Sequence, residues 1–453
     1  MPDSQATVSP QPAGAADAAG AASGVSVTKI HPDAVPGLTG LRFIAAFSVL
    51  IAHGFGVLMQ GHDSPGSVAY WVTQASGFGM TLFFVLSGFV IHYNYATLVT
   101  AGRLRGTAAY LWARFARLYP LFLLTLLGYL LVSRKHYEFW AGHPEQLHSA
   151  LQALPYFLFS VQSWLYRPVG DTTLIYAIGG SSSVTWSIST EWFFYFLYPL
   201  VAWLILRSRT SRSTVVLVVA WCALWIALAT ALYDRAADIN AWAVARYGPI
   251  AEMREPQDVY AAQDSYLRWL LYFSPYLRMG EFVLGSLIAQ LYVQLRSRKP
   301  DALENTIGTL VLLAAAISTI PITYLMYSPD VGANIFRKMY MNFGLAPSAA
   351  LVVFCAARYD NVLSRLLTSR PALILGDASY SIYLTHFLVL MVAFKLIGTV
   401  VHGAIFNAVA LTLSTLAILL VSVLLYTFYE LPARKWLRRL WGVKRPQAAL
   451  AKT

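Results

Sequence analysis

The most regular feature of this sequence is a series of apolar stretches, separated by shorter polar segments. Most of them approach the roughly 20 residues that a helix needs to cross the hydrocarbon core of a bilayer. We therefore predict helices at 41–60, 77–98, 116–132, 184–206, 214–233, 267–294, 306–326, 340–357, 372–397 and 404–430. The predicted fold class is all-α: a polytopic membrane protein with about ten transmembrane helices in one bundle.

The two ends of the chain lack such stretches. Residues 1–36 are rich in Ala, Gly, Ser and Pro and contain few large apolar side chains. Such a composition cannot repay the entropy of ordering, so we predict a disordered tail. The segment also lacks the basic start and apolar core of a secretory signal peptide. Residues 434–453 form a short basic tail, which leaves 37–433 as one integral membrane domain.

The composition agrees with a membrane protein. The chain is 57% hydrophobic and only 12% charged, whereas an ordinary soluble domain is about 25% charged. Its two cysteines exclude a disulfide-rich secreted scaffold. The net charge of +12 is compatible with binding to nucleic acid, with anionic lipid or with basic cytoplasmic loops.

The placement of the basic residues decides between these three causes. If the weakly apolar segment 151–165 stays on the outer side, the basic residues fall in alternate loops, which are then the cytoplasmic ones. If that segment crosses the membrane, the loop containing Arg207, Arg209 and Arg212 lies outside and breaks the positive-inside rule. The sequence leaves that crossing open, and ten spans are the better topology. We expect the plasma (bacterial inner) membrane, both termini in the cytoplasm, and no nucleic-acid partner. The outer segments 133–183 and 234–265 are long enough to fold over a site as lids.

The first predicted helix carries two ionisable residues, Arg42 and His53. Eleven residues bring a helix back to within about 20° of its starting direction and raise it about 16 Å. Both side chains therefore lie on one face, with Arg42 at the cytoplasmic edge and His53 near mid-membrane. An arginine at this position is ordinarily explained as an anchor that snorkels to the membrane surface, and a histidine as a hydrogen-bond partner of another helix. Their alignment favours a functional role.

The second and third helices contain a small-residue pair and an arginine pair. Ser87 and Gly88 form a notch that is typical of close helix packing. Arg114 and Arg117 are three residues apart and share a helix face. They are either positive-inside anchors or a phosphate site open to the cytoplasm, because arginine binds phosphate through paired hydrogen bonds.

The segment 184–206 carries Ser187, Glu191 and Tyr195 at four-residue intervals, which places them on one helix face. A carboxylate inside a membrane is costly, so Glu191 must be protonated or paired. His53 or an arginine is the natural partner.

A second polar stripe lies in the segment 372–397, where Ser379, Tyr383 and His386 follow at i, i+4 and i+7. Hydrogen bonding within the core is the alternative explanation for it.

Glu281 has Arg278 three residues before it, which favours a structural ion pair. No convincing metal-ligand spacing, P-loop or G-x-S-x-G turn is present, so no metal is predicted.

In combination these motifs resemble the membrane-bound acyltransferase-3 family, from about Gly37 to Arg439. Many members have two adjacent glutamates where this chain has Thr190-Glu191, so one acidic side chain is missing. The resemblance is to the stand-alone form, without an appended hydrolase-like domain. The matching positions are Arg42 and His53; Phe83, Phe84, Ser87, Gly88 and Phe89; Arg114, Arg117, Tyr119 and Pro120; Trp186, Ser187, Ser189, Glu191 and Tyr195; and Ser379, Tyr380, Ser381, Tyr383, Leu384 and His386.

The resemblance implies transfer of an acyl group, commonly acetyl, from cytoplasmic acyl-CoA to a sugar hydroxyl. The acceptor would be a surface polysaccharide such as an exopolysaccharide or O-antigen, or its lipid-linked precursor. Partners would be the lipid bilayer and either polysaccharide-assembly machinery or a second copy of the chain. The implied roles are a general base, His53, oriented or charged by Glu191; a CoA phosphate site of Arg42, Arg114 and Arg117; and hydrogen bonds to the acceptor or the developing oxyanion from Ser87, Tyr383 or His386.

Two alternatives stay open at this point. A non-enzymatic flippase or transporter of lipid-linked sugars would also have many spans, intramembrane charges and long outer loops. Within the enzyme interpretation, a lipid or a small molecule can replace the sugar as the acceptor. A purely structural scaffold explains the polar sites poorly, because each costs insertion energy.

Overall fold

The computed structural model describes residues 35–58, 67–132, 144–178, 184–253, 263–328, 330–332, 334–340, 342–397 and 403–440, and most of these residues are helical. The tail predicted at 1–36 lies almost entirely outside the described residues, as does the chain after Leu440. The basic segment that begins at Arg434 is helical as far as Leu440.

The longer helices are α1 (Pro36–Leu58), α2 (Val68–Ala101), α3 (Arg103–Val132), α6 (Trp186–Ile205), α7 (Ser211–Asp234), α10 (Pro275–Leu295), α11 (Ala302–Tyr327), α12 (Ala346–Arg358), α15 (Ser379–Ile397) and α16 (Ala404–Leu425). Shorter helices are α5 (Pro144–Leu158), α8 (Ala236–Tyr247), α9 (Tyr266–Arg268), α13 (Val362–Leu367), α14 (Arg370–Asp377) and α17 (Leu431–Leu440). Single turns are the 3₁₀ elements η2 (Pro249–Ala251), η4 (Arg337–Met339) and η5 (Phe343–Leu345), and the π elements η3 (Trp269–Phe273) and η6 (Tyr426–Glu430). Strands β1 (Pro168–Val169) and β2 (Thr172–Thr173) form an antiparallel hairpin.

Within the described residues, eight helices are long and apolar enough to cross a membrane. Each coincides with one of the ten predicted segments, and the other two segments contain α10 and α12. Helix α12 has only 13 residues. Helix α10 lies in the interior, where it packs against other helices and therefore tolerates the buried Arg278 and Glu281. The protein is thus an all-α integral membrane protein, as predicted.

Two of the predicted segments are interrupted in the structure. The segment 267–294 breaks at Ser274, because Pro275 begins α10, where its fixed φ and missing N–H suit a helix start. The segment 372–397 breaks at Ala378, which separates α14 from α15. In both cases the hydropathy continues through the break, so hydropathy alone could not locate it.

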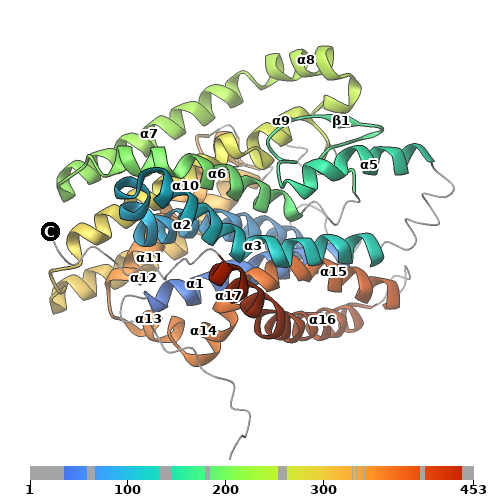
Figure 1. The fold of residues 1–453 in the computed structure, drawn as a ribbon. Helices are drawn as coiled ribbons and strands as arrows, with labels where there is room; N and C mark the ends of the chain where they lie inside the picture. Colours follow the sequence, from blue (N-terminus) through green and yellow to red (C-terminus); the bar gives the residue numbers. More distant parts are fainter. Residues whose placement is uncertain are drawn as a thin grey trace, which may run out of the picture. The chain divides into compact units, whose positions relative to one another are not determined.

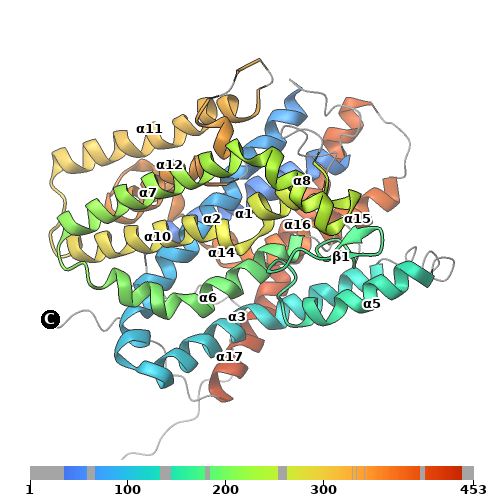
Figure 2. The same ribbon diagram turned by 90° about the horizontal axis from the view of Figure 1, so that it is seen from above.

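Helix α2 is central to the bundle and packs closely against both α1 and α10 (Figure 2). A Cβ atom on Gly88 of α2 would lie 1.9 Å from the Phe282 carbonyl oxygen, and one on Gly285 of α10 would lie 2.0 Å from the Val85 carbonyl oxygen. The notch predicted at Ser87-Gly88 is therefore confirmed at Gly88. It brings the backbones of α2 and α10 into direct contact.

Replacing Gly88 by alanine should destabilise the bundle. The added methyl forces α2 and α10 apart, and overpacking of this kind costs about 1–3 kcal/mol. Thermal unfolding of the purified protein in detergent measures the effect. Gly56→Ala is the matched control, because Gly56 of α1 is exposed and nothing lies within 4 Å of an added Cβ. Equal melting temperatures for the two variants would contradict this packing.

Short elements gather at one end of the bundle, where α5, the β1–β2 hairpin, α8 and α9 lie together (Figure 1). The Tyr166 hydroxyl donates to the Asp264 carbonyl oxygen over 2.8 Å, and the Thr173 backbone N–H donates to the Asp264 carboxylate over 2.8 Å. These bonds join the described parts of the two long segments that were predicted to form lids. Helix α5 ends at Leu158 and the chain then turns, so 151–165 does not form a helix of spanning length.

Candidate active site

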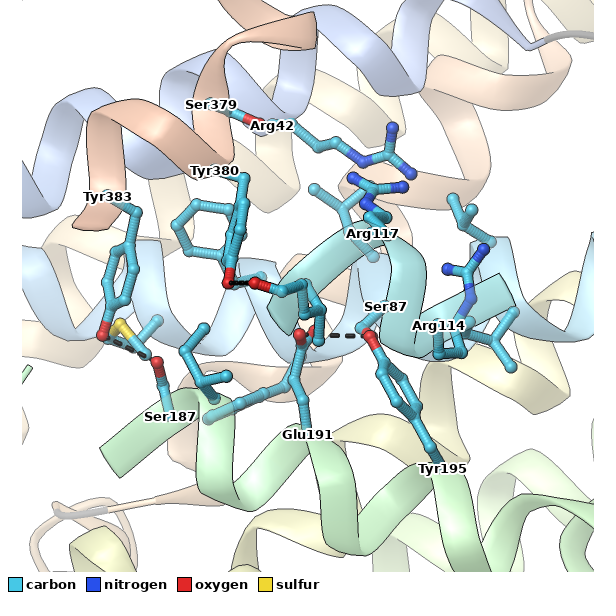
Figure 3. Close-up of a pocket in the computed structure, with 18 residues that line it drawn as sticks. Arg42, Ser87, Arg114, Arg117, Ser187, Glu191, Tyr195, Ser379, Tyr380 and Tyr383 are labelled. Atoms are coloured by element: carbon cyan, nitrogen blue, oxygen red, sulfur yellow. Dashed lines mark hydrogen bonds between the residues drawn. The ribbon is translucent and has the colours of Figure 1, made fainter. Parts of the chain in front are cut away.

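A cavity lies between α1, α2, α3, α6 and α15 (Figure 3). It contains about 670 Å³ of empty space, counting its opening to solvent. Apolar side chains such as Phe83 and Phe84 form part of the wall. The polar side chains of the wall are Arg42, Ser87, Arg114, Arg117, Ser187, Glu191, Tyr195, Ser379, Tyr380 and Tyr383.

Three arginines lie together on one side of this cavity. Arg42 comes from α1, while Arg114 and Arg117 come from successive turns of α3, and Figure 3 shows all three guanidinium groups on the same side. Arg114 is only 6% exposed. Arg42 interacts electrostatically with both Arg114 and Arg117. Because buried like charges repel each other, this arrangement favours a bound anion.

The carboxylate of Glu191 faces the same cavity from α6. It accepts a hydrogen bond of 3.1 Å from the Tyr195 hydroxyl, one helical turn away (Figure 3). Tyr195 also interacts with the Ser87 side chain, and Glu191 interacts electrostatically with Arg42. Ser187, Glu191 and Tyr195 all line the cavity, so the helix face predicted from their spacing is confirmed.

Tyr383 lines another part of the cavity. Its hydroxyl donates to the Val184 carbonyl oxygen over 2.8 Å and accepts from the Ser187 hydroxyl over 2.8 Å (Figure 3). Its ring packs edge-on against Phe83, with the ring centroids 5.6 Å apart. The tyrosine is thus held by two helices other than its own.

His53 and His386 form a pair that is not part of the cavity wall. The distance between Nδ1 of His53 and Nε2 of His386 is 2.8 Å. Nδ1 of His386 is 2.6 Å from the carbonyl oxygen of Tyr383. The expected pairing of Glu191 with His53 is therefore not what the structure has: His53 is bonded to His386, and Glu191 to Tyr195. Which side chains meet between α1, α6 and α15 depends on helix packing, which spacing within one helix does not determine.

The hydrogen bonds of this pair fix where its protons lie. A carbonyl oxygen only accepts, so Nδ1 of His386 must carry a proton that it donates to Tyr383. In the neutral ring Nε2 of His386 then accepts, and Nδ1 of His53 is its donor. The remaining nitrogen of neutral His53, Nε2, has a free lone pair. Nε2 of His53 can therefore accept a proton, and the hydrogen bond to His386 orients the His53 ring.

Arg278 and Glu281 form the structural ion pair that their spacing predicts, with 2.9 Å between Nη1 of Arg278 and Oε1 of Glu281. Both side chains are buried, and Thr81 donates a further hydrogen bond to the same carboxylate oxygen. This pair joins α2 to α10 next to the cavity without lining it.

Sequence reasoning assigned no role to several residues of this region. Ser379 and Tyr380 line the cavity at the start of α15, and the Tyr380 hydroxyl donates to the Leu118 carbonyl oxygen over 2.7 Å. Arg434 and Arg438 of α17 lie beside the arginines of α3. Their spacing of one helical turn was a signal, but it was explained as the charge of a tail.

Comparison with known proteins gives the following similarities. Residues 35–427 match the family model described as an acyltransferase domain. The acyltransferase MdmB of Streptomyces mycarofaciens is 28% identical over 424 residues, which cover 91% of this chain and 94% of that protein. YrhL of Bacillus subtilis, provisionally named a peptidoglycan O-acetyltransferase, is 25% identical over 416 residues, covering 89% of this chain and 55% of that protein. This chain thus spans about half of YrhL. No solved structure matches.

Proposed function

We propose, from the premise that this chain belongs to the acyltransferase-3 family, that it is an O-acyltransferase that moves an acetyl group from cytoplasmic acyl-CoA to a sugar hydroxyl. The acceptor is a surface polysaccharide or its lipid-linked precursor, and the enzyme lies in the bacterial inner membrane with both termini in the cytoplasm. The observation that carries the proposal is the convergence of three arginines, three tyrosines and a glutamate on one cavity inside a membrane protein.

The arginines support acyl-CoA as the donor. Its diphosphate needs several cationic hydrogen-bond donors, and Arg42, Arg114 and Arg117 supply them at one side of the cavity. The cavity extends from there to Tyr383 along the apolar wall that includes Phe83. An uncharged pantetheine arm suits such a wall, and it directs the thioester toward Tyr383 and the histidine pair beyond it.

The reaction that these groups favour is direct transfer. The acceptor oxygen forms a bond to the thioester carbonyl carbon while its proton passes to Nε2 of His53. The developing oxyanion takes a hydrogen bond from Ser87, and one from Tyr383 once its hydroxyl turns away from the Val184 carbonyl oxygen. The carbon–sulfur bond then breaks, and the same proton goes from His53 to the sulfur of CoA. His386 is already bonded to His53 and to the Tyr383 carbonyl, so it acts as a positioning residue.

The sugar acceptor is supported by a relative. YrhL carries peptidoglycan O-acetyl transfer in its provisional name, and peptidoglycan is a polysaccharide outside the inner membrane. The described parts of the outer segments pack around Asp264.

The test supplies purified protein in lipid nanodiscs with acetyl-CoA labelled in its acetyl group. Soluble peptidoglycan fragments, a lipid-linked sugar, a phospholipid and a small alcohol are offered separately as acceptors. We expect a labelled ester on a sugar-containing acceptor. If the label appears on the phospholipid or the alcohol instead, the acceptor is not a sugar and that part of the proposal is wrong. If the label stays on CoA while the lipid-linked sugar crosses proteoliposome membranes, the protein is a flippase and the proposal is wrong.

The hydrogen bond between Glu191 and Tyr195 gives a further prediction. Glu191→Gln and Tyr195→Phe should each lower kcat/KM, because the first removes the charge to which Tyr195 donates and the second removes the donor. The double variant should be little worse than either single variant. A hydrogen bond to a charged group contributes about 1.5–3 kcal/mol, and a double-mutant cycle on kcat/KM measures this coupling. Additive losses would show that the two residues act independently.

A further inference from the structure

Helix α17 brings additional arginines to the side of the cavity where Arg114 and Arg117 lie. It packs against α3, and the Trp112 indole N–H donates to the Leu437 carbonyl oxygen over 2.9 Å. Of its basic residues, Lys435 and Arg439 are exposed, whereas Arg434 and Arg438 are partly buried against the bundle. One face of α17 therefore has the solvated charges of a membrane-flanking helix, and the other directs two arginines inward.

The inward arginines crowd against those of α3. The Tyr95 hydroxyl accepts one hydrogen bond from Nη2 of Arg114 over 2.7 Å and another from Nη2 of Arg438 over 3.3 Å. Arg434 interacts electrostatically with both Arg117 and Arg438. The Tyr95 phenol thus joins two guanidinium groups. Because the phenol is neutral, it does not compensate their positive charges.

Hydrogen-bond donors remain unused in this cluster. Nε of Arg114 and Nε of Arg438 are buried and have no partner among the described residues. Glu430 interacts electrostatically with Arg117 and Arg434. This single carboxylate, which also accepts a hydrogen bond of 2.8 Å from Ser381, cannot balance the charge of the four clustered arginines of α3 and α17. Like charges held together with unused donors are a site to which an anion is expected to bind.

We propose that Arg434 and Arg438 form a second anion subsite that binds the phosphate monoester on the ribose of CoA. This subsite adjoins Arg42, Arg114 and Arg117, which the proposed function assigns to the diphosphate, and the inference rests on that function. CoA carries these two phosphate groups apart from each other, so two neighbouring arginine clusters match its charge distribution. Arginine is suited to the monoester because its guanidinium binds two phosphate oxygens at once.

The subsite makes the enzyme discriminate between acetyl-CoA and acetyl-3′-dephospho-CoA, which lacks only the monoester. Charge-assisted hydrogen bonds contribute about 1.5–3 kcal/mol, so wild-type kcat/KM should favour acetyl-CoA by about 10-fold or more. In R434M/R438M that preference should fall close to one. A thermal unfolding transition in detergent close to that of the wild type shows that this variant is folded.

The matched control is K435M/R439M, which removes the same charge from the exposed face of α17. It should keep the wild-type preference. A preference that survives in R434M/R438M, or that disappears equally in K435M/R439M, would overturn the subsite. Wild-type turnover of both donors at equal kcat/KM would overturn the subsite and leave the proposed function standing. Turnover of neither donor would overturn both.

Discussion

His53→Ala is expected to lower kcat by about 10²- to 10⁴-fold, the contribution typical of a well-placed general base. The histidine pair carries this expectation, because the bond from Nδ1 of His53 to His386 leaves Nε2 free to take a proton. The KM for acetyl-CoA should change little, since His53 is not among the residues that line the cavity. Steady-state transfer kinetics of the purified protein measure both constants.

The control for this variant is His148→Ala, which removes an exposed histidine from α5. His386→Phe should reproduce much of the loss in kcat with the same KM, because phenylalanine cannot accept the proton of His53. His386→Gln should restore part of it, since its amide both accepts and donates. Undiminished kcat in His53→Ala, or equal losses for His386→Phe and His386→Gln, would contradict the assigned roles.

Arg117→Met is expected to raise the KM for acetyl-CoA by about 10- to 100-fold, the equivalent of one or two lost charge-assisted hydrogen bonds. Arg117 is the sharper choice than Arg114, because Arg114 also holds Tyr95. The kcat at saturating donor should fall far less than the KM rises. Arg105→Met is the control: it removes an exposed arginine from the same helix. If the two variants have the same KM, the arginines are membrane anchors only.

The faces of single helices could be predicted from the sequence. Arg114 and Arg117, and likewise Ser187, Glu191 and Tyr195, line one cavity because residues three or four apart on a helix share a side. The same rule placed Glu281 beside Arg278. Such relations depend only on helix geometry, which the hydropathy pattern had already established.

Relations between helices could not be predicted in this way. His53 and His386 are 333 positions apart, and their contact depends on how α1 packs against α15. The interior position of α10 was equally hidden, since a buried helix and a lipid-facing helix are both apolar. The contact between the arginines of α17 and those of α3 was missed because a basic helix after a membrane span is usually explained by topology alone.

Binding of labelled acetyl-CoA to the purified protein tests the central claim most directly, because it needs no acceptor. The wild-type protein should bind it saturably, unlabelled acetyl-CoA should compete, and Ser87→Trp should abolish binding by filling the cavity that Ser87 lines. His148→Ala should bind as the wild type does. Absence of saturable binding, or full binding by Ser87→Trp, would contradict an acyl-CoA site in this cavity.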